Sequence, residues 1–207
     1  MYTNTKGSLA NTTPIEVIFN KLKKDPGADV RYDIQHCEDI NKQDGDGNTL
    51  LHLSQNTKVV KELIRLGAGH DIDNKKYEFP YHMAVHQKNY KKLKALIDIK
   101  KVAMRPGLPE HIRKYPQSDV DWNSNPSFNS DDTALRVAVL NNDLKAAKML
   151  LDAGASPSGA NGRIDDVYLM ECSENPKMIR LLHRYGGEAT YNDEDEWIGK
   201  FGHLLKK

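Results

Sequence analysis

The fold is decided by residues 133–155, TALRVAVLNNDLKAAKMLLDAGA. Apolar residues recur at helical spacing in this stretch, which predicts a short helix, a tight turn and a longer helix closed by Gly154. Residues 44–68, DGDGNTLLHLSQNTKVVKELIRLGA, have the same layout. Self-similarity at a period of about 33 residues is typical of stacked repeats, whose units bury their apolar faces on one another and leave a long surface free. We therefore expect a binding protein rather than a globular enzyme core.

These residues resemble the ankyrin repeat, whose family pattern is D-x-x-G-x-T-P-L-H-L-A-A followed by a second helix that ends in L-L-x-x-G-A. The first unit carries Thr49, His52 and the closing Gly67. The second unit has FPYHMA at 79–84, the third is residues 133–155, and the fourth is degenerate. With a period of about 33 residues as the ruler, the resemblance covers most of the chain.

The spacings between equivalent residues locate the departures from a regular stack. Ile64 and Ile97 are 33 residues apart, which is one family period. His52 and His82 are only 30 apart, so the first unit is expected to have lost three residues between its helices. Ile97 and Leu151 are 54 apart, which places about 21 extra residues between the second and third units.

The resemblance implies an all-α fold, an α-solenoid with short β-hairpin tips, in which an ankyrin-repeat stack is closed by helical caps. The predicted organisation is a disordered N-terminus at 1–12, N-terminal capping helices that form a divergent repeat at 13–40, ankyrin repeats at 41–72 and 73–101, an insertion loop at 102–126, an ankyrin repeat at 127–158, a degenerate repeat at 159–190 and a C-terminal capping helix at 191–207.

Composition agrees with a thin, elongated fold. Among 207 residues, 38% are hydrophobic and 29% are charged, which suits a solenoid with much exposed surface. The formal net charge of +1 gives no global field that favours nucleic acid or membrane. No apolar run is long enough to span a membrane, and the polar start lacks the apolar core of a signal peptide. Cys37 and Cys172 are far apart in sequence, so we expect two buried thiols in a reducing compartment and a cytoplasmic protein.

Three patterns could support chemistry, and each has a structural explanation. Residues 44–48 start like a calcium loop but are not followed by the glycine and glutamate that such a loop needs, so we expect a hairpin tip. His82 and His86 are one helical turn apart, yet HMAVH lacks the glutamate of a zinc peptidase and His82 falls on the family's structural histidine. No nucleophile signature surrounds Cys37 or Cys172. We therefore expect no enzymatic activity, no metal and no cofactor.

Two features leave alternatives open. One helix and its exit carry Lys91, Lys92, Lys94, Lys100 and Lys101, which form either a solvated convex face or a docking patch for an acidic partner or anionic lipid head groups. The polar, proline-rich run at 104–129 around the insertion carries Tyr115, Trp122 and Phe128. It is either a lid over the interrupted stack or a functional loop whose aromatic residues anchor a partner.

By family position, the chain is expected to be a monomeric adaptor that binds a protein, and not nucleic acid, through its concave face and hairpin tips. The degenerate repeats also resemble ankyrin proteins that intracellular bacteria deliver into host cells or that large viruses carry, which suggests an effector acting on a host protein. The alternative is the targeting fragment of a larger enzyme, or an enzyme with an unrecognised site. The predicted partner-binding residues are Asp46, Asn48, Lys75, Lys76, Glu78, His86, Gln87, Trp122, Asn129, Ser130, Asp132, Leu140 and Asn141.

Overall fold

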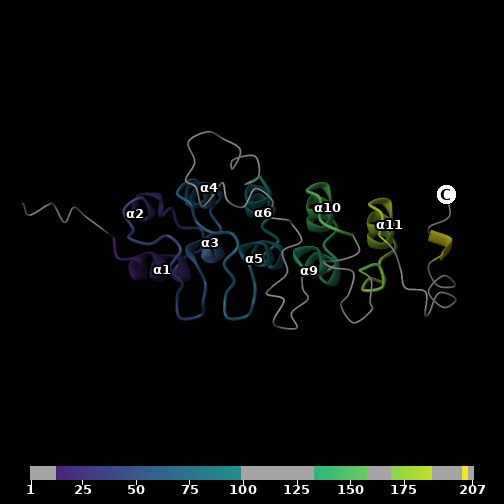
Figure 1. Cartoon of the computed structure of the whole chain (residues 1–207), viewed down its shortest axis with the longest axis horizontal. Coiled ribbons are helices and arrows are strands. Elements are labelled where there is room, and N and C mark those ends of the chain that lie inside the picture. The colour runs from purple at the N-terminus through teal and green to yellow at the C-terminus, as the bar shows by residue number, and fades with distance from the viewer. Residues whose placement is uncertain (1–12, 99–132, 158–168, 188–201, 205–207) are drawn as a thin grey trace, which may run out of the picture.

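The computed structural model describes residues 13–98, 133–157, 169–187 and 202–204 of the chain. Within these ranges the chain is helical, without a β-strand, and the helices form one elongated stack (Figure 1). The elements are α1 (Ile15–Lys24), α2 (Arg31–Ile34), α3 (Leu50–Leu53), α4 (Thr57–Arg65), α5 (Pro80–His86), α6 (Tyr90–Ile97), α9 (Ala134–Leu140), α10 (Leu144–Asp152), α11 (Pro176–Arg184) and the 3-10 helix η3 (Gly202–Leu204).

The helices are arranged in two layers (Figure 1). The inner layer consists of α1, α3, α5 and α9, and each of these helices contacts the next. The outer layer consists of α2, α4, α6, α10 and α11, which also contact one another in that order. Because α5 packs on α9 and α6 packs on α10, the stack continues across the position where the sequence predicts an insertion. The architecture is therefore an α-solenoid.

The core follows the apolar pairs seen in the sequence. In α4 the side chains of Val59, Val60 and Leu63 are inaccessible to solvent, and α10 buries Leu150 and Leu151 in the same way. Full burial of one such side chain contributes roughly 1.5–3 kcal/mol relative to its exposure. The repeated apolar pairs thus supply the cohesion between neighbouring units.

Glycine ends these outer helices as the sequence predicts. Gly67 and Gly154 follow α4 and α10 with φ angles of 93° and 97°, in the left-handed region that side chains with a Cβ rarely adopt. The backbone N–H of Ala68 donates to the carbonyl of Leu63 at 2.9 Å, which satisfies one of the carbonyls left unpaired at the helix end.

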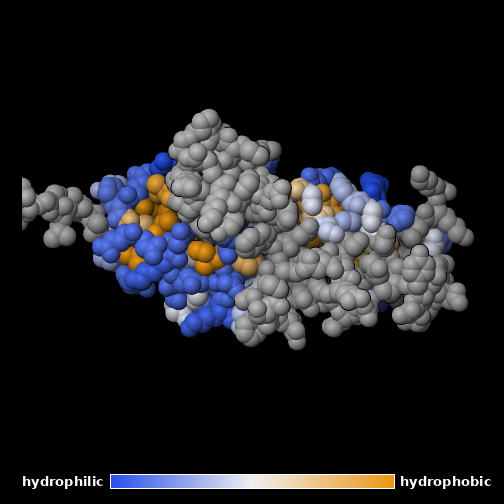
Figure 2. Space-filling model, in the orientation of Figure 1, coloured by the Kyte–Doolittle hydropathy of each residue, from blue (hydrophilic) through white to orange (hydrophobic). Residues whose placement is uncertain are grey.

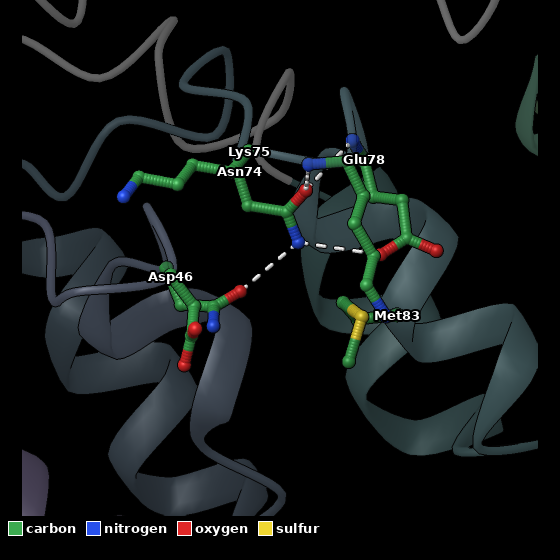
Figure 3. Close-up of a pocket in the computed structure, with 7 residues that line it drawn as sticks. Asp46, Asn74, Lys75, Glu78 and Met83 are labelled. Atoms are coloured by element: carbon green, nitrogen blue, oxygen red, sulfur yellow. Dashed lines mark hydrogen bonds between the residues drawn. The ribbon is translucent and has the colours of Figure 1, made fainter.

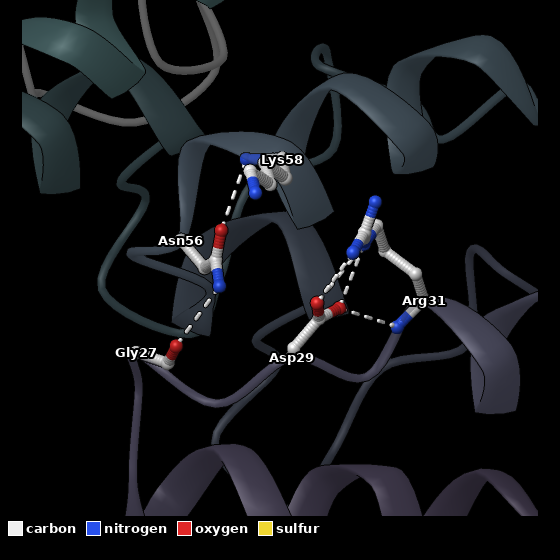
Figure 4. Close-up of polar contacts among 5 residues, drawn as sticks. All are labelled: Gly27, Asp29, Arg31, Asn56 and Lys58. Carbon is white, nitrogen blue, oxygen red and sulfur yellow. Dashed lines mark hydrogen bonds and ion pairs between the residues drawn. The ribbon is translucent and has the colours of Figure 1, made fainter.

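Asparagine side chains connect the outer helices α4 and α6 to the unit before each of them. Oδ1 of Asn56 accepts from the backbone N–H of Lys58 at 3.0 Å and caps α4, while its Nδ2 donates to the carbonyl of Gly27 at 3.0 Å (Figure 4). Asn89 repeats both contacts one period later, capping α6 and donating to the carbonyl of Gln55 at 3.0 Å. One side chain thus stabilises a helix end and a contact between units.

α10 departs from this pattern. Asp143 caps α10 but has no amide to donate, and it instead accepts from the hydroxyl of Tyr90 at 3.1 Å. At α11 an asparagine caps the helix again, but Nδ2 of Asn175 donates to the side-chain Oδ1 of Asn142, at 2.6 Å, and not to a backbone carbonyl. The connection between units is therefore retained with a different donor.

The shortening of the first unit lies in its inner helix. α3 has four residues and ends at Leu53, whereas α5 and α9 have seven each. The longer helices are followed by a residue with positive φ, Lys88 at 50° and Asn142 at 52°. The three missing residues thus correspond to one helical turn, and the carbonyl of His52 has no helical residue four positions later to pair with.

The prediction of a solvated lysine face is wrong for Lys92. Its side chain is fully buried, and Nζ donates to the carbonyl of His52 at 2.7 Å. Burial lowers the pKa of Lys92 to about 7, because the apolar surroundings disfavour the charged amine. The lysine occupies a core position of α6 and satisfies a carbonyl at the end of the shortened α3.

Several other predictions are not confirmed or concern segments outside the described residues. The predicted β-hairpin tips are not confirmed, since the described residues contain turns and no strand. The predicted disorder at 1–12, the insertion at 102–126 and, apart from η3, the C-terminal cap at 191–207 lie outside the described residues. Neither Cys37 nor Cys172 forms a disulfide, and both are partly exposed rather than buried.

Candidate functional site

Two turns of the same construction project from the side of the stack next to the inner layer, and we call them tip 1 (residues 44–48) and tip 2 (residues 74–78). In tip 1, Oδ1 of Asp44 accepts from the backbone N–H groups of Asp46 and Asn48 at 2.9 and 2.8 Å. In tip 2, Oδ1 of Asn74 accepts from the N–H groups of Lys76 and Glu78 at 2.9 and 3.0 Å. Short polar side chains favour such turns because they satisfy nearby backbone groups.

The two tips are bonded to each other. The backbone N–H of Lys75 donates to the carbonyl of Asp46 at 3.0 Å, and Nδ2 of Asn74 donates to Oδ1 of Asn48 at 3.0 Å. Gly47 permits this approach, since its φ is 81° and a Cβ there would lie 2.7 Å from the nitrogen of Lys75. The spacing of the tips is consequently fixed by one backbone and one side-chain hydrogen bond.

His52 connects tip 2 to the start of α3. Its Nδ1 accepts from the backbone N–H of Thr49 at 3.0 Å, and its Nε2 donates to the carbonyl of Glu78 at 2.9 Å. The ring is fully buried, and this burial lowers the pKa of His52 to about 4, so the imidazole is neutral at physiological pH. His52 is therefore a structural histidine that joins adjacent loops.

A groove of about 350 Å³ lies between the tips, and Met83 projects toward it from α5 (Figure 3). Its lining combines acidic, basic, amide and apolar groups within one small volume. The lining residues are Asp46, Asn48, Asn74, Lys75, Lys76, Glu78 and Met83.

Some charged side chains around the groove already have partners within the protein, and others do not. Asp46 lies 3.7 Å from the amine of Lys23, and Glu78 accepts from Asn74 at 3.2 Å and lies 3.3 Å from Nε2 of His86. Lys75 and Lys76 are exposed, and neither forms an ion pair within the part of the chain that the structure describes. The two lysines are therefore the cations of this groove that an incoming ligand can pair with.

The structure brings five of the predicted site residues into the groove: Asp46, Asn48, Lys75, Lys76 and Glu78. His86 adjoins them through Glu78. Gln87, Leu140 and Asn141 lie instead at the C-terminal ends of α5 and α9, where Leu140 keeps 53% of its surface exposed. Trp122, Asn129, Ser130 and Asp132 lie outside the described residues.

Sequence reasoning missed Asn74 and Met83. Asn74 could have been predicted from spacing, since it stands 30 residues after Asp44, the same interval that separates His82 from His52. Met83 could not, because the pattern of an amphipathic helix predicts that an apolar residue lies in the core.

The described residues supply little for catalysis or metal binding. They contain no group of three or more His, Cys, Asp or Glu side chains that could hold a metal ion. His82 is buried, and its Nδ1 accepts from the backbone N–H of Phe79 at 2.8 Å. Burial also raises the pKa of the Cys37 thiol, which lowers the fraction of reactive thiolate.

The family follows from a match across these units. A family model described as ankyrin repeats (3 copies) matches residues 54–161, just over half of the chain. The protein belongs to the ankyrin-repeat family. Ankyrin repeats are generally protein–protein interaction modules and are typically non-catalytic. No helix in the described part of this ankyrin stack is long and apolar enough to cross a membrane.

If the histidines of this ankyrin stack are structural, zinc and calcium should leave its thermal stability unchanged. Nδ1 of His82 already accepts a hydrogen bond from the backbone, and Nε2 of His86 lies 3.3 Å from a carboxylate oxygen of Glu78. Calorimetric titration of the full chain with each ion checks this. Stoichiometric binding at micromolar concentration that His86→Ala abolishes would contradict the prediction.

Proposed function

We propose that this ankyrin-repeat protein binds a protein partner through the groove between tips 1 and 2, and that binding rather than turnover is its activity. The observation that carries the proposal is the pair of unpaired lysines, Lys75 and Lys76, on a turn whose backbone is fixed by Asn74. A preorganised turn loses little conformational entropy on binding, so more of the interaction energy appears as affinity.

The groove suits a segment that presents at least one carboxylate. Lys75 and Lys76 would pair with acidic side chains, while Asp46 and Glu78 would orient a nearby donor. Met83 offers a flexible apolar contact for a side chain that enters between the tips. We extend the proposed binding surface to the other predicted partner-binding residues. We also propose that the protein is a cytoplasmic adaptor and that it acts as an effector on a host protein.

Reversal of both lysine charges tests the proposal. Lys75→Glu with Lys76→Glu should remove a bound partner from the full chain and slow its association, because charges at an interface mainly steer encounter. Lys58→Glu with Lys61→Glu is the matched control, since these lysines are also exposed and unpaired within the described residues but lie on α4 in the outer layer. Quantitative affinity capture followed by mass spectrometry compares the three proteins.

Each outcome of the capture experiment decides the question. A partner retained by the parent and the control but lost from the groove variant supports the proposal. Partners retained equally by all three, or lost equally from both variants, would contradict a role for the groove. Turnover of a captured protein by the purified chain would favour the enzyme alternative.

Trp122 gives a separate prediction for the insertion. Hot spots at interfaces are enriched in tryptophan, so Trp122→Ala is expected to weaken partner binding by roughly 1–4 kcal/mol. We expect the stability of the variant to stay within about 0.5 kcal/mol of the parent. Binding calorimetry and thermal unfolding measure the two effects, and a variant that unfolds at a lower temperature with intact affinity would make the loop a structural lid.

A further inference from the structure

A second surface of the molecule repeats one charge pattern in four helices. Each of α4, α6, α10 and α11 has a cation at its second position and another at its fifth. All eight side chains are exposed. We call them the basic ridge: Lys58, Lys61, Lys91, Lys94, Lys145, Lys148, Lys177 and Arg180.

The helical period places these cations opposite the core. In α10 the buried residues are Ala146, Ala147, Leu150 and Leu151, which occupy positions three, four, seven and eight. Positions two and five point the other way, since successive residues are rotated by about 100°. α4 buries the same four positions, and α11 buries positions three, four and seven.

The four helices lie side by side in the outer layer, so the ridge is continuous (Figure 1). Cations three residues apart on a helix are separated by about 5–6 Å, and neighbouring helices by about 8–10 Å. Hydrophilic residues are visible along this edge at α10 and α11 (Figure 2). The cations therefore form a continuous two-row array along the outer layer.

Most of these cations are available. Lys148 is paired with Asp152 at 2.7 Å, and the amine of Lys145 lies 4.2 Å from the centre of the Tyr90 ring. The other six form no ion pair with any described residue. The formal net charge of the chain is only +1. The regular row of cations on this face therefore reflects an uneven distribution of charge over the surface and not an overall excess of basic residues.

We propose that the basic ridge is a docking surface for an anionic membrane surface, distinct from the tip groove. A continuous array of cations matches the repeated negative charges of lipid head groups, and each lysine near such a surface adds attraction without specific geometry. Seven of the eight residues are lysine, a hydrated point charge, and not arginine, whose planar fork suits bidentate recognition of single phosphates. Single-stranded nucleic acid would also need free aromatic faces, but Lys145 covers Tyr90.

The test is co-flotation of the full chain with vesicles at about 0.1 M salt. The parent should bind vesicles of phosphatidylcholine with about 30 mol % phosphatidylserine, and not phosphatidylcholine alone. Lys61→Gln, Lys91→Gln and Lys94→Gln together should weaken this partitioning by roughly 100-fold. The matched control, Lys21→Gln, Lys24→Gln and Lys88→Gln, removes the same charge from exposed lysines outside both the ridge and the tip groove and should bind nearly as the parent does.

Thermal unfolding of both triple variants checks that they are folded, and duplex DNA at the same salt serves as the competing polyanion. Binding to anionic vesicles that only the ridge variant loses supports the proposal. Absence of vesicle binding by the parent, or equal loss in the ridge variant and the control, overturns it. Binding to duplex DNA without binding to vesicles would assign the ridge to nucleic acid and overturn it as well.

Discussion

When the pH is raised from 7 to about 10, the free energy of unfolding is expected to increase by on the order of 4 kcal/mol because of the titration of Lys92. Burial lowers the pKa of the folded amine from 10.5 to about 7, whereas the unfolded chain keeps the ordinary value. In this window the unfolded state therefore binds a proton that the folded state lacks, and stability rises with pH. Below pH 7 both states are protonated, and the cost of the buried charge is constant.

Lys92→Met isolates this contribution from other groups that titrate at alkaline pH. Methionine fits a similar volume without a charge, so the variant should lose the rise in stability between pH 7 and 10. It also leaves the carbonyl of His52 without its donor, which costs about 1–3 kcal/mol at every pH. Urea unfolding across the pH range measures both effects. Parallel pH profiles for parent and variant would show that the amine is not desolvated in the folded protein.

Leu150→Ala is expected to lower the free energy of unfolding by roughly 2–5 kcal/mol. Leu150 has no exposed surface and lies in α10, which packs on α6, α9 and α11. Truncation leaves a cavity at a junction between units, and solenoid stability depends on such junctions. The effect should appear as a lower midpoint in chemical and thermal unfolding.

Lys148→Ala is the surface control for this change. Lys148 lies on the same helix, and its pair with Asp152 is exposed and screened by water, so its loss should lower the melting temperature far less. A decrease in melting temperature for Leu150→Ala no larger than that for Lys148→Ala would contradict the assignment of α10 to the core of the stack.

The helical stack was predictable because its signals are local and periodic. Apolar pairs such as Leu63 and Ile64 recur at the family period, and glycine at 67 and 154 marks where helices end. These features act through neighbouring residues in sequence, so a single chain is enough to read them.

Lys92 was mispredicted because residue type was given more weight than register. It stands 33 residues after Val59, and both are the third residue of an outer helix, a buried position. Its placement also depends on α3 being one turn short, which leaves the carbonyl of His52 facing the core. That contact joins residues 40 positions apart, and no local pattern encodes it.

The candidate site was predicted in part. Asp46, Lys75 and Glu78 followed from family position, and the structure places them around one groove. The hydrogen bonds that set the groove's width, from Asn74 to Asn48 and from Lys75 to Asp46, join different units and could not be read from either tip alone.

Amide hydrogen exchange of the full chain, free and bound to its captured partner, tests the central claim most directly. We expect slower exchange on binding at residues 44–48 and 74–78, with little change in α4 and α10. This protection should disappear with Lys75→Glu and Lys76→Glu. Protection confined to the outer helices, or unchanged exchange at both tips in a saturated complex, would contradict it.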